Sequence, residues 1–277
     1  MKDRSLSPRS RKWKAVVNRP FLSDSPMVGP PPHTWRDLRR PHLRRCVLDQ
    51  DAMAWEQSLG GGSDGYSWKV RIGHEHFVVK VFYDTSPPDW YCYWAIQREC
   101  QNAAVLQMIE AALAQSGPIQ VCSDPRTHSD ALDNLYSFSD ESIAASIAPE
   151  PPCTSLVGMP RMRKCFGWLK VHGHMLSRLP SALRPQAYDV DRIRRGFGYE
   201  EYFAIVYEFI DEEPNDAAVV EDVARFLWLT GFGHTMSPAG RNWKAGVLID
   251  LSDVVYACGL GWNHRLYEPD TAEYILA

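Results

Sequence analysis

The stretch that decides the fold runs from Leu59 to Tyr83, with the sequence LGGGSDGYSWKVRIGHEHFVVKVFY. Residues 66–72 and 76–84 alternate large apolar and polar side chains and are rich in β-branched and aromatic residues, which is typical of strands. The residues GHEH between them suit a short hairpin connection. We therefore expect two antiparallel strands, with a glycine-rich segment leading into the first of them.

The glycine-rich segment has the spacing G-x-G-x-x-G, at Gly60, Gly62 and Gly65. Such a loop can bring backbone N–H groups against phosphates, because no side chain blocks the approach. Glycine-rich hairpin turns without a ligand are common, so this spacing alone does not specify a phosphate site. A dinucleotide-binding fold requires a helix after the glycines, whereas a strand is predicted here.

Lys80 lies in the middle of the apolar run FVVKVF. A lone lysine in a strand usually faces solvent, but the apolar flanks favour burial here. A strong helix pattern follows over residues 94–115, with Glu99 in its first half and Glu110 farther along. We predict that Lys80 pairs with Glu99, since an apolar setting tolerates two paired opposite charges better than either charge alone.

A glycine loop, a strand lysine and a helix glutamate in this order resemble the first lobe of a protein kinase, in which the lysine holds phosphates. Residues 201–210, AIVYEF among them, resemble the strand before the adenine-binding hinge, although an ordinary core strand has the same pattern. Asp250, in LIDLSD, takes the place of the Mg²⁺-holding Asp, and Leu251 and Ser252 stand where a kinase has Phe and Gly. If Mg-ATP binds, Asp250 is the expected metal ligand, and the nucleotide-binding residues are Gly60, Gly62, Gly65, Lys80, Glu99 and Asp250.

The segment HTMSPAGR, residues 234–241, resembles a kinase catalytic loop without its catalytic groups. Met236 stands where the catalytic Asp is expected, and a thioether cannot accept the proton. Arg241 stands where the metal-binding Asn is expected, and a guanidinium has no acceptor atom for Mg²⁺. Asn242 is one position away and could substitute for it. We therefore predict no catalytic residues and no required cofactor, with Mg-ATP as the candidate ligand.

The predicted fold class is α+β, with a kinase-like architecture. We expect an antiparallel first-lobe sheet, one long helix and a shortened, mostly helical second lobe. The further predicted elements are strands at 165–173, 201–210 and 246–255 and a helix at 216–232.

Two segments are rich in Ser and Pro and are predicted to lie outside the ordered core. Residues 1–40 are expected to form a disordered basic arm, and residues 41–277 the kinase-like domain. Within that domain we expect a mobile insertion at about 117–158, containing one short helix near 129–138.

Composition and charge limit the classes of protein. The hydrophobic share of 45% and charged share of 23% are ordinary for a globular protein, and no apolar run is long enough to span a bilayer. Residues 1–45 carry 12 Lys or Arg against 3 Asp or Glu, a net of +9, and the remainder carries 18 against 31, a net of −13. The basic arm could contact nucleic acid or an acidic partner, or it could be a solvated tail.

Cysteine usage and the start of the chain bear on its compartment. The seven cysteines include no C-x-x-C pair, which argues against a disulfide framework and a zinc ribbon. The basic start has no apolar stretch behind it, so we expect no secretory signal. Reduced thiols in a nuclear or cytoplasmic protein are the expectation.

Several longer blocks resemble one fungal family. They are PHLRRCVLDQDAMAWEQSLGGG, RECQNAAVLQMIEAALAQ, MPRMRKCFGWLK, AIVYEFIDE and TGFGHTMSPAGRNWKAGVLIDLSDVV. They are similar to the kinetochore Sim-four complex subunit family (Sim-four and Mal-two associated protein two), from about Pro41 onward. The resemblance implies a nuclear, centromere-associated, non-enzymatic subunit that binds other subunits of a complex. It supplies no catalytic residues.

Three functional hypotheses follow. The first is a pseudokinase that acts as a scaffold or subunit of a nuclear, kinetochore-type complex. The second is an atypical phosphotransferase, in which Lys80, Glu99 and Asp250 hold Mg-ATP and another residue is the base. The third is a sensor that binds ATP without turnover. The expected location is the nucleus, with the cytoplasm as the alternative.

Overall fold

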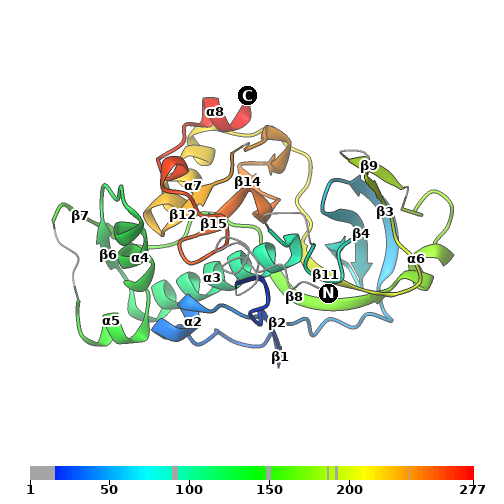
Figure 1. Cartoon of the computed structure of the whole chain (residues 1–277), viewed down its shortest axis with the longest axis horizontal. Helices are drawn as coiled ribbons and strands as arrows, with labels where there is room; N and C mark the ends of the chain where they lie inside the picture. Colours follow the sequence, from blue (N-terminus) through cyan, green and yellow to red (C-terminus); the bar gives the residue numbers. More distant parts are fainter. Residues whose placement is uncertain (1–15, 89–92, 148–150, 186, 191–192, 237) are drawn as a thin grey trace, which may run out of the picture.

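The computed structural model describes residues 16–88, 93–147, 151–185, 187–190, 193–236 and 238–277. Over these residues the fold is mixed α and β, with a large, mostly antiparallel sheet, several helices and four small two-stranded sheets (Figure 1). Among these residues, no helix has the length and apolar character that crossing a membrane requires.

The large sheet has seven strands in the order β1-β2-β8-β11-β5-β4-β3. Its strands are β1 (Leu22–Pro26), β2 (Leu43–Arg45), β3 (Ala54–Gly61), β4 (Gly65–Ile72), β5 (Glu75–Phe82), β8 (Cys165–His172) and β11 (Glu201–Glu208). All pairings from β8 to β3 are antiparallel, whereas β1 and β2 join the β8 edge in parallel. The predicted hairpin is confirmed as β4 and β5, and the predicted strands at 165–173 and 201–210 as β8 and β11.

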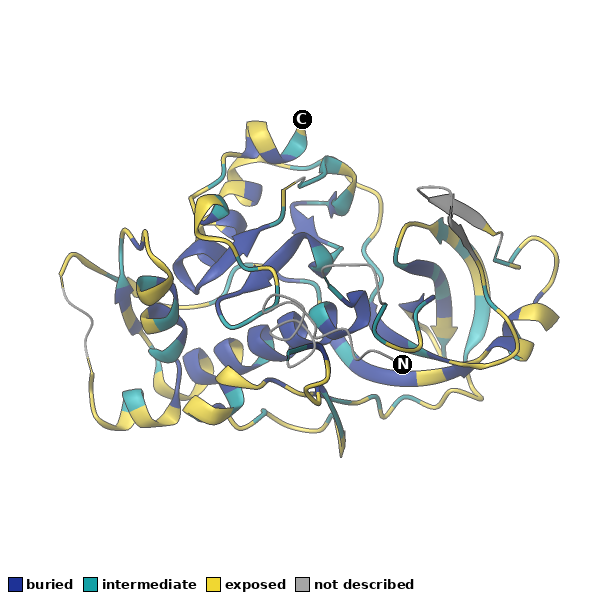
Figure 2. Cartoon of the chain, viewed as in Figure 1, coloured by how far each residue is buried: buried dark blue, intermediate teal, exposed yellow. Residues whose placement is uncertain are grey.

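The long helix α3 (Ala95–Ser116) confirms the helix predicted at 94–115. Most of its residues are buried, and it runs from the large sheet to the second half of the chain (Figures 1 and 2). Gly117 ends it in a backbone conformation with φ of 74°, which glycine adopts without strain. The other helices are α2 (Trp35–Arg39), α4 (His128–Tyr136), α5 (Asp140–Ala144), α6 (Gly173–Arg178), α7 (Ala217–Leu229) and α8 (Ala272–Leu276).

The region that follows α3 and lies outside the large sheet is mixed rather than mostly helical. This corrects the prediction of a mostly helical second lobe. Its helices alternate with small antiparallel sheets: β6 (Ile119–Cys122) with β7 (Cys153–Leu156), β12 (Phe232–His234) with β15 (Val254–Tyr256), and β13 (Trp243–Lys244) with β14 (Val247–Leu248). A further pair, β9 (Tyr188–Val190) and β10 (Ile193–Arg195), belongs to the connection before β11.

The continuous strand predicted at 246–255 is also wrong. The Asp250 side chain accepts a hydrogen bond from the backbone N–H of Ser252 at 3.0 Å, which turns the chain into a 3-10 segment, Leu251–Asp253. This local side-chain bond competes with continued strand pairing. The strand is therefore divided into β14 and β15, which pair with different partners.

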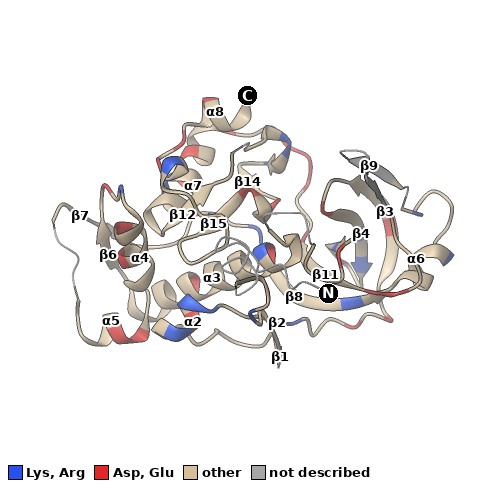
Figure 3. Cartoon of the chain, viewed as in Figure 1, with Lys and Arg blue, Asp and Glu red and all other residues tan. Residues whose placement is uncertain are grey.

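The described part of the predicted disordered arm, from residue 16 to residue 40, is ordered and packed. Phe21 and Leu38 are buried, and the Phe21 ring lies 5.0 Å from the Trp94 ring, edge to face. The backbone N–H of Trp35 donates to Oε2 of Glu141 at 2.8 Å. In Figure 3 the basic α2 lies beside the acidic α5, so the basic segment meets acidic residues of its own chain. Residues 1–15 lie outside the described part.

The predicted mobile insertion at about 117–158 is likewise ordered where it is described. It contains β6, α4, α5 and β7, and α4 confirms the short helix expected near 129–138. Leu135 and Phe138 are fully buried, and Nδ2 of Asn134 donates to the carbonyl of Leu229 in α7 at 3.0 Å. The buried side chains and the Asn134 hydrogen bond therefore keep this segment ordered, although its composition is rich in Ser, Asp and Pro.

We expect Leu38→Ala to lower the free energy of unfolding by about 2–5 kcal/mol, because it leaves a cavity beneath α2. Leu38 is 0% exposed, whereas Val28 is 68% exposed, so Val28→Ala is the matched control and should change stability little. Urea unfolding of the two variants measures the difference. Equal stabilities would show that residues 16–40 contribute nothing to the core.

Candidate functional site

A cleft of about 840 Å³ lies between the large sheet and the second half of the chain. Residues 59–65, which include the end of β3, the turn and the start of β4, form one wall. The segments around β13, β14 and Asp250 form the opposite wall. Charged side chains of both signs line it: Asp64, Lys80, Arg98, Arg163, Glu212, Arg241, Lys244, Asp250 and Asp253.

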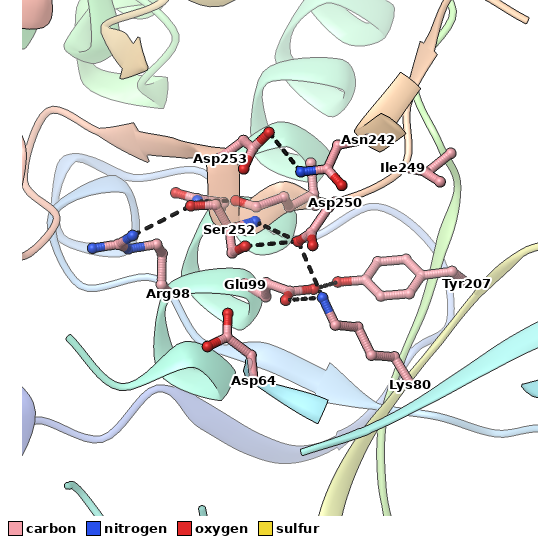
Figure 4. A network of polar contacts seen from close by, with 12 residues as sticks. Asp64, Lys80, Arg98, Glu99, Tyr207, Asn242, Ile249, Asp250, Ser252 and Asp253 are labelled. Atoms are coloured by element: carbon pink, nitrogen blue, oxygen red, sulfur yellow. Dashed lines mark hydrogen bonds and ion pairs between the residues drawn. The ribbon is translucent and has the colours of Figure 1, made fainter. Parts of the chain in front are cut away.

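Three predicted site residues meet at this cleft, which Lys80 and Asp250 line and Glu99 does not (Figure 4). Nζ of Lys80, on β5, lies 2.5 Å from Oε1 of Glu99 on α3 and 3.0 Å from Oδ1 of Asp250. The second oxygen of Glu99 accepts a hydrogen bond from the Tyr207 hydroxyl at 3.0 Å. Glu99 is 0% exposed. The predicted Lys80–Glu99 pair is thus formed, and Glu110 takes no part in it.

Burial and charge act against each other in this cluster. For Lys80, burial acts to lower the pKa, but the carboxylates of Asp250 and Glu99 outweigh it and raise the pKa. Burial raises the pKa of Glu99 to about 7, and Lys80 opposes that rise. For Asp250, burial acts to raise the pKa, but Lys80 and the Ser252 hydrogen bonds lower it to about 2. Asp250 is therefore ionised at neutral pH.

Helix α3 is also fastened to the segment that carries Asp250. Nδ2 of Asn102 donates to the carbonyls of Leu251 and Val254, at 2.8 and 2.7 Å. Nη1 of Arg98 donates to the carbonyl of Ser252 at 3.2 Å. These bonds fix the 3-10 turn after Asp250 on the same helix that supplies Glu99, so the carboxylate is held in place from both sides.

The three predicted loop glycines differ in whether, and why, the fold requires glycine at their positions. Gly60 has a φ of +96°, which few other residues adopt. At Gly65 a Cβ atom would lie 2.3 Å from the carbonyl oxygen of Val81, so packing against β5 alone requires glycine. At Gly62 a Cβ atom would meet nothing within 4 Å and φ is not positive, so the fold imposes no such requirement there. Gly62 lines the cleft, where the lack of a side chain leaves its backbone open to a ligand.

The loop at 234–241 places no acid in the cleft. Met236 and Arg241 both line the cleft, and Met236 is 81% exposed. His234 is buried, with Nε2 3.6 Å from Oδ2 of Asp270, and burial lowers the pKa of His234 to about 4. His234 is therefore buried and does not line the cleft, and Met236 has no group that could take part in proton transfer.

Asp253 is an acid in the cleft that sequence reasoning missed. Oδ2 of Asp253 accepts a hydrogen bond from Nδ2 of Asn242 at 2.8 Å, and the Asp253 carbonyl accepts one from the backbone of Thr235 at 2.8 Å. Burial raises the pKa of Asp253, and the nearby Asp250 adds to this. The sequence contained a sign of it, since LSD places a second Asp three residues after Asp250.

Arg163 is a second missed residue. Its Nη1 donates to the carbonyl of Ile249 at 2.6 Å, its Nε donates to the carbonyl of Glu208 at 3.0 Å, and its guanidinium lies 4.6 Å from the Tyr207 ring centre. Arg163 thereby joins the end of β11 to the residue before Asp250. No local sequence pattern predicts this contact, because its partners are more than 40 positions away.

The residues present fit a nucleotide with Mg²⁺ better than a metal held by protein alone. Within the described ranges, no group of three or more His, Cys, Asp or Glu side chains is arranged to hold a metal ion. Mg²⁺ commonly uses one or two carboxylates together with substrate phosphates, and Asp250 is an ionised carboxylate beside a lysine. Asp250 and Lys80 would hold such a ligand beneath the glycine turn.

Comparisons with known proteins give no identity. No protein-family model matches the sequence, and no curated protein matches it. The similarity to the kinetochore subunit family stays a prediction from the sequence blocks.

We expect Lys80→Met to lower the free energy of unfolding by about 3–5 kcal/mol at neutral pH, because Glu99 loses its partner inside the protein. The exposed pair of Lys170 and Glu201 provides the matched control, and Lys170→Met should change stability little. Chemical unfolding of both variants measures the contrast.

The pH dependence of Lys80→Met tests the cause. The pKa of Glu99 is already raised above its usual value of 4.5, and removal of Lys80 raises it further. A raised folded-state pKa gives stability that is present at low pH and lost as pH rises through it. The deficit of Lys80→Met should therefore be largest above pH 7 and shrink as the pH falls to about 7, the pKa of Glu99 in the unaltered protein. A deficit independent of pH would contradict a buried, unpaired Glu99.

Proposed function

We propose that the chain has a protein-kinase-like fold whose cleft binds a nucleoside triphosphate with Mg²⁺, and that it acts as a non-catalytic binding protein. The observation that carries the proposal is the meeting of Lys80 with Glu99 and Asp250 beside the glycine turn. Strand, helix and loop each supply one charge in the order expected of a kinase. Lys80 would contact phosphates, and Asp250 would hold the metal ion.

The apolar residues of the cleft support a base-binding role. Leu59, Val78 and Ile249 line it and offer apolar surface. Lys244 and Glu212 also line the cleft and pair at 2.5 Å. We infer that the base lies against these apolar residues.

The non-catalytic part of the proposal is supported by the loop at 234–241. Met236 has no proton-accepting atom, and Arg241 brings positive charge where a kinase has a metal ligand. We further propose, from the family resemblance, that the protein is a subunit of a nuclear complex and is recognised by other proteins. In that role the nucleotide would stabilise the fold instead of reacting.

Binding can be tested with Mg-ATP. We expect Mg-ATP to raise the unfolding midpoint of the protein, with a stabilisation of about 2.7 kcal/mol when the ligand is 100-fold above its Kd. Asp250→Asn should remove the Mg²⁺-dependent part of binding, measured by calorimetry with Mg²⁺ or with EDTA. Asp222→Asn, an exposed change on α7, is the control and should bind normally. No binding to the unaltered protein at millimolar Mg-ATP would overturn the proposal.

A second candidate function is phosphotransfer, and Asp253 is the observation that favours it. Asp253 lines the same cleft as Asp250 and accepts a hydrogen bond from Asn242. Its carbonyl is bonded to Thr235, next to Met236, so Asp253 lies beside the loop that lacks an acid. In this candidate, Asp253 accepts the proton of an acceptor hydroxyl as that oxygen attacks the terminal phosphate.

The two candidates differ in label transfer. If Asp253 is a base, the protein with γ-labelled ATP should label itself or an added hydroxyl acceptor. Asp253→Asn should then reduce transfer by about 100-fold or more and leave nucleotide binding intact. Asp222→Asn again serves as the control. Nucleotide binding without any transfer rejects this candidate and leaves the non-catalytic proposal standing.

A further inference from the structure

Two cysteines lie opposite each other outside the cleft. Strands β6 and β7 pair in antiparallel fashion, and Cys122 is directly opposite Cys153 in that register. These two strands lie at one end of the molecule, beyond α4 and distant from the β3–β4 turn (Figure 1). Along the chain, α4 and α5 lie between the two cysteines.

The backbone bonds identify the type of pair. The N–H of Cys122 donates to Oδ1 of Asn134 at 2.7 Å, and the carbonyl of Cys122 accepts from Nδ2 of Asn134 at 3.0 Å. The next ladder bond runs from the N–H of Ser123 to the carbonyl of Pro152 at 2.9 Å. Cys122 and Cys153 therefore form a non-hydrogen-bonded pair, since the backbone of Cys122 is bonded to α4 instead.

This pair type suits a disulfide. Opposed residues of a non-hydrogen-bonded pair have Cα atoms about 4.5 Å apart, with their side chains on the same face. Disulfides commonly join Cα atoms about 4.4–6.8 Å apart. We propose that Cys122 and Cys153 are an oxidation site at which a reversible disulfide forms in the presence of a small-molecule disulfide such as oxidised glutathione.

Exposure favours Cys153 over the other described cysteines, and the strand register places Cys122 opposite it. Cys153 is exposed and Cys122 is partly exposed. Cys100 and Cys165 are buried, and burial raises the pKa of both thiols. Cys258 is hydrogen-bonded to the Tyr136 hydroxyl at 3.3 Å, and burial raises its pKa as well. Reaction with a thiol reagent follows thiolate content and access, so the exposed Cys153 reacts first.

The reaction proceeds by two exchanges. The thiolate of Cys153 attacks one sulfur of oxidised glutathione, forms a mixed disulfide and releases one glutathione thiolate. The thiolate of Cys122 then attacks the Cys153 sulfur, which forms the protein disulfide and releases the second glutathione. Two protein thiols are oxidised and one glutathione disulfide is reduced to two thiols, so atoms and electrons balance.

The bond would fasten a segment that α7 already holds. Asn134 connects Cys122 to the carbonyl of Leu229 on α7, at 3.0 Å. A disulfide between Cys122 and Cys153 closes the part of the chain that contains α4 and α5. Closing such a loop removes conformations from the unfolded chain, so the oxidised protein is the more stable form.

Peptide mapping after incubation of the full chain in glutathione redox buffers tests the proposal. Cleavage after Lys and Arg places Cys122 in peptide 99–126 and Cys153 in peptide 127–161. We expect these peptides to be linked, with fragmentation assigning the link to Cys122 and not Cys100. Dithiothreitol should separate them, and the oxidised protein should unfold several degrees higher than the reduced protein.

Two cysteine variants test whether Cys122 and Cys153 form the disulfide. Cys153→Ser, an exposed change, should abolish both the linked peptide and the rise in unfolding temperature, whereas Cys258→Ser should behave like the unaltered protein. Absence of the link in oxidised glutathione, or a stable glutathione adduct at Cys153 with Cys122 unreacted, would overturn the proposal. A link from Cys153 to any other cysteine would overturn it too.

Discussion

The ammonium group of Lys80 imposes the constraint on which the rest of the structure depends. It lies beside an inaccessible carboxylate, Glu99, and that carboxylate is tolerable only while both charges and the Tyr207 hydroxyl stay within hydrogen-bonding distance. Strand β5, helix α3 and strand β11 must therefore come together at one point. Asp250 adds the second half of the chain to the same point, so one cation positions four elements.

Local patterns were enough to predict the elements that carry this cation. The alternation in β4 and β5 and the helical spacing in α3 are written within short windows of sequence, and a buried lysine demands a nearby acid. Arg163 could not be found in this way, because its role arises from contacts between distant segments. Asp253 stands three residues after Asp250, so the sequence did contain a sign of it. The kinase-like architecture and the nuclear role go beyond what secondary-structure patterns establish, and both stay proposals.

Composition gave wrong predictions of disorder for two segments that are held in place by a few buried contacts. The Ser- and Pro-rich regions at 16–40 and 117–158 looked unable to bury enough apolar surface to fold. Leu38, Leu135 and Phe138 are nevertheless fully buried, because each segment packs against a surface supplied by distant parts of the chain. The opposed cysteines of β6 and β7 were hidden for the same reason, since the register of a strand pair cannot be deduced from cysteine spacing.

Helix α3 is tied to both sides of the cleft at once. Arg98 and Asn102 bind it to the turn after Asp250, while Glu99 and Gln107 bind it to β5 and to the Cys165 carbonyl at the start of β8. Helix α3 thereby links the two sides of the cleft, and these hydrogen bonds restrict their rotation relative to each other. A ligand would therefore enter a cleft that already has its shape, and little binding free energy would be lost to rearrangement of the protein.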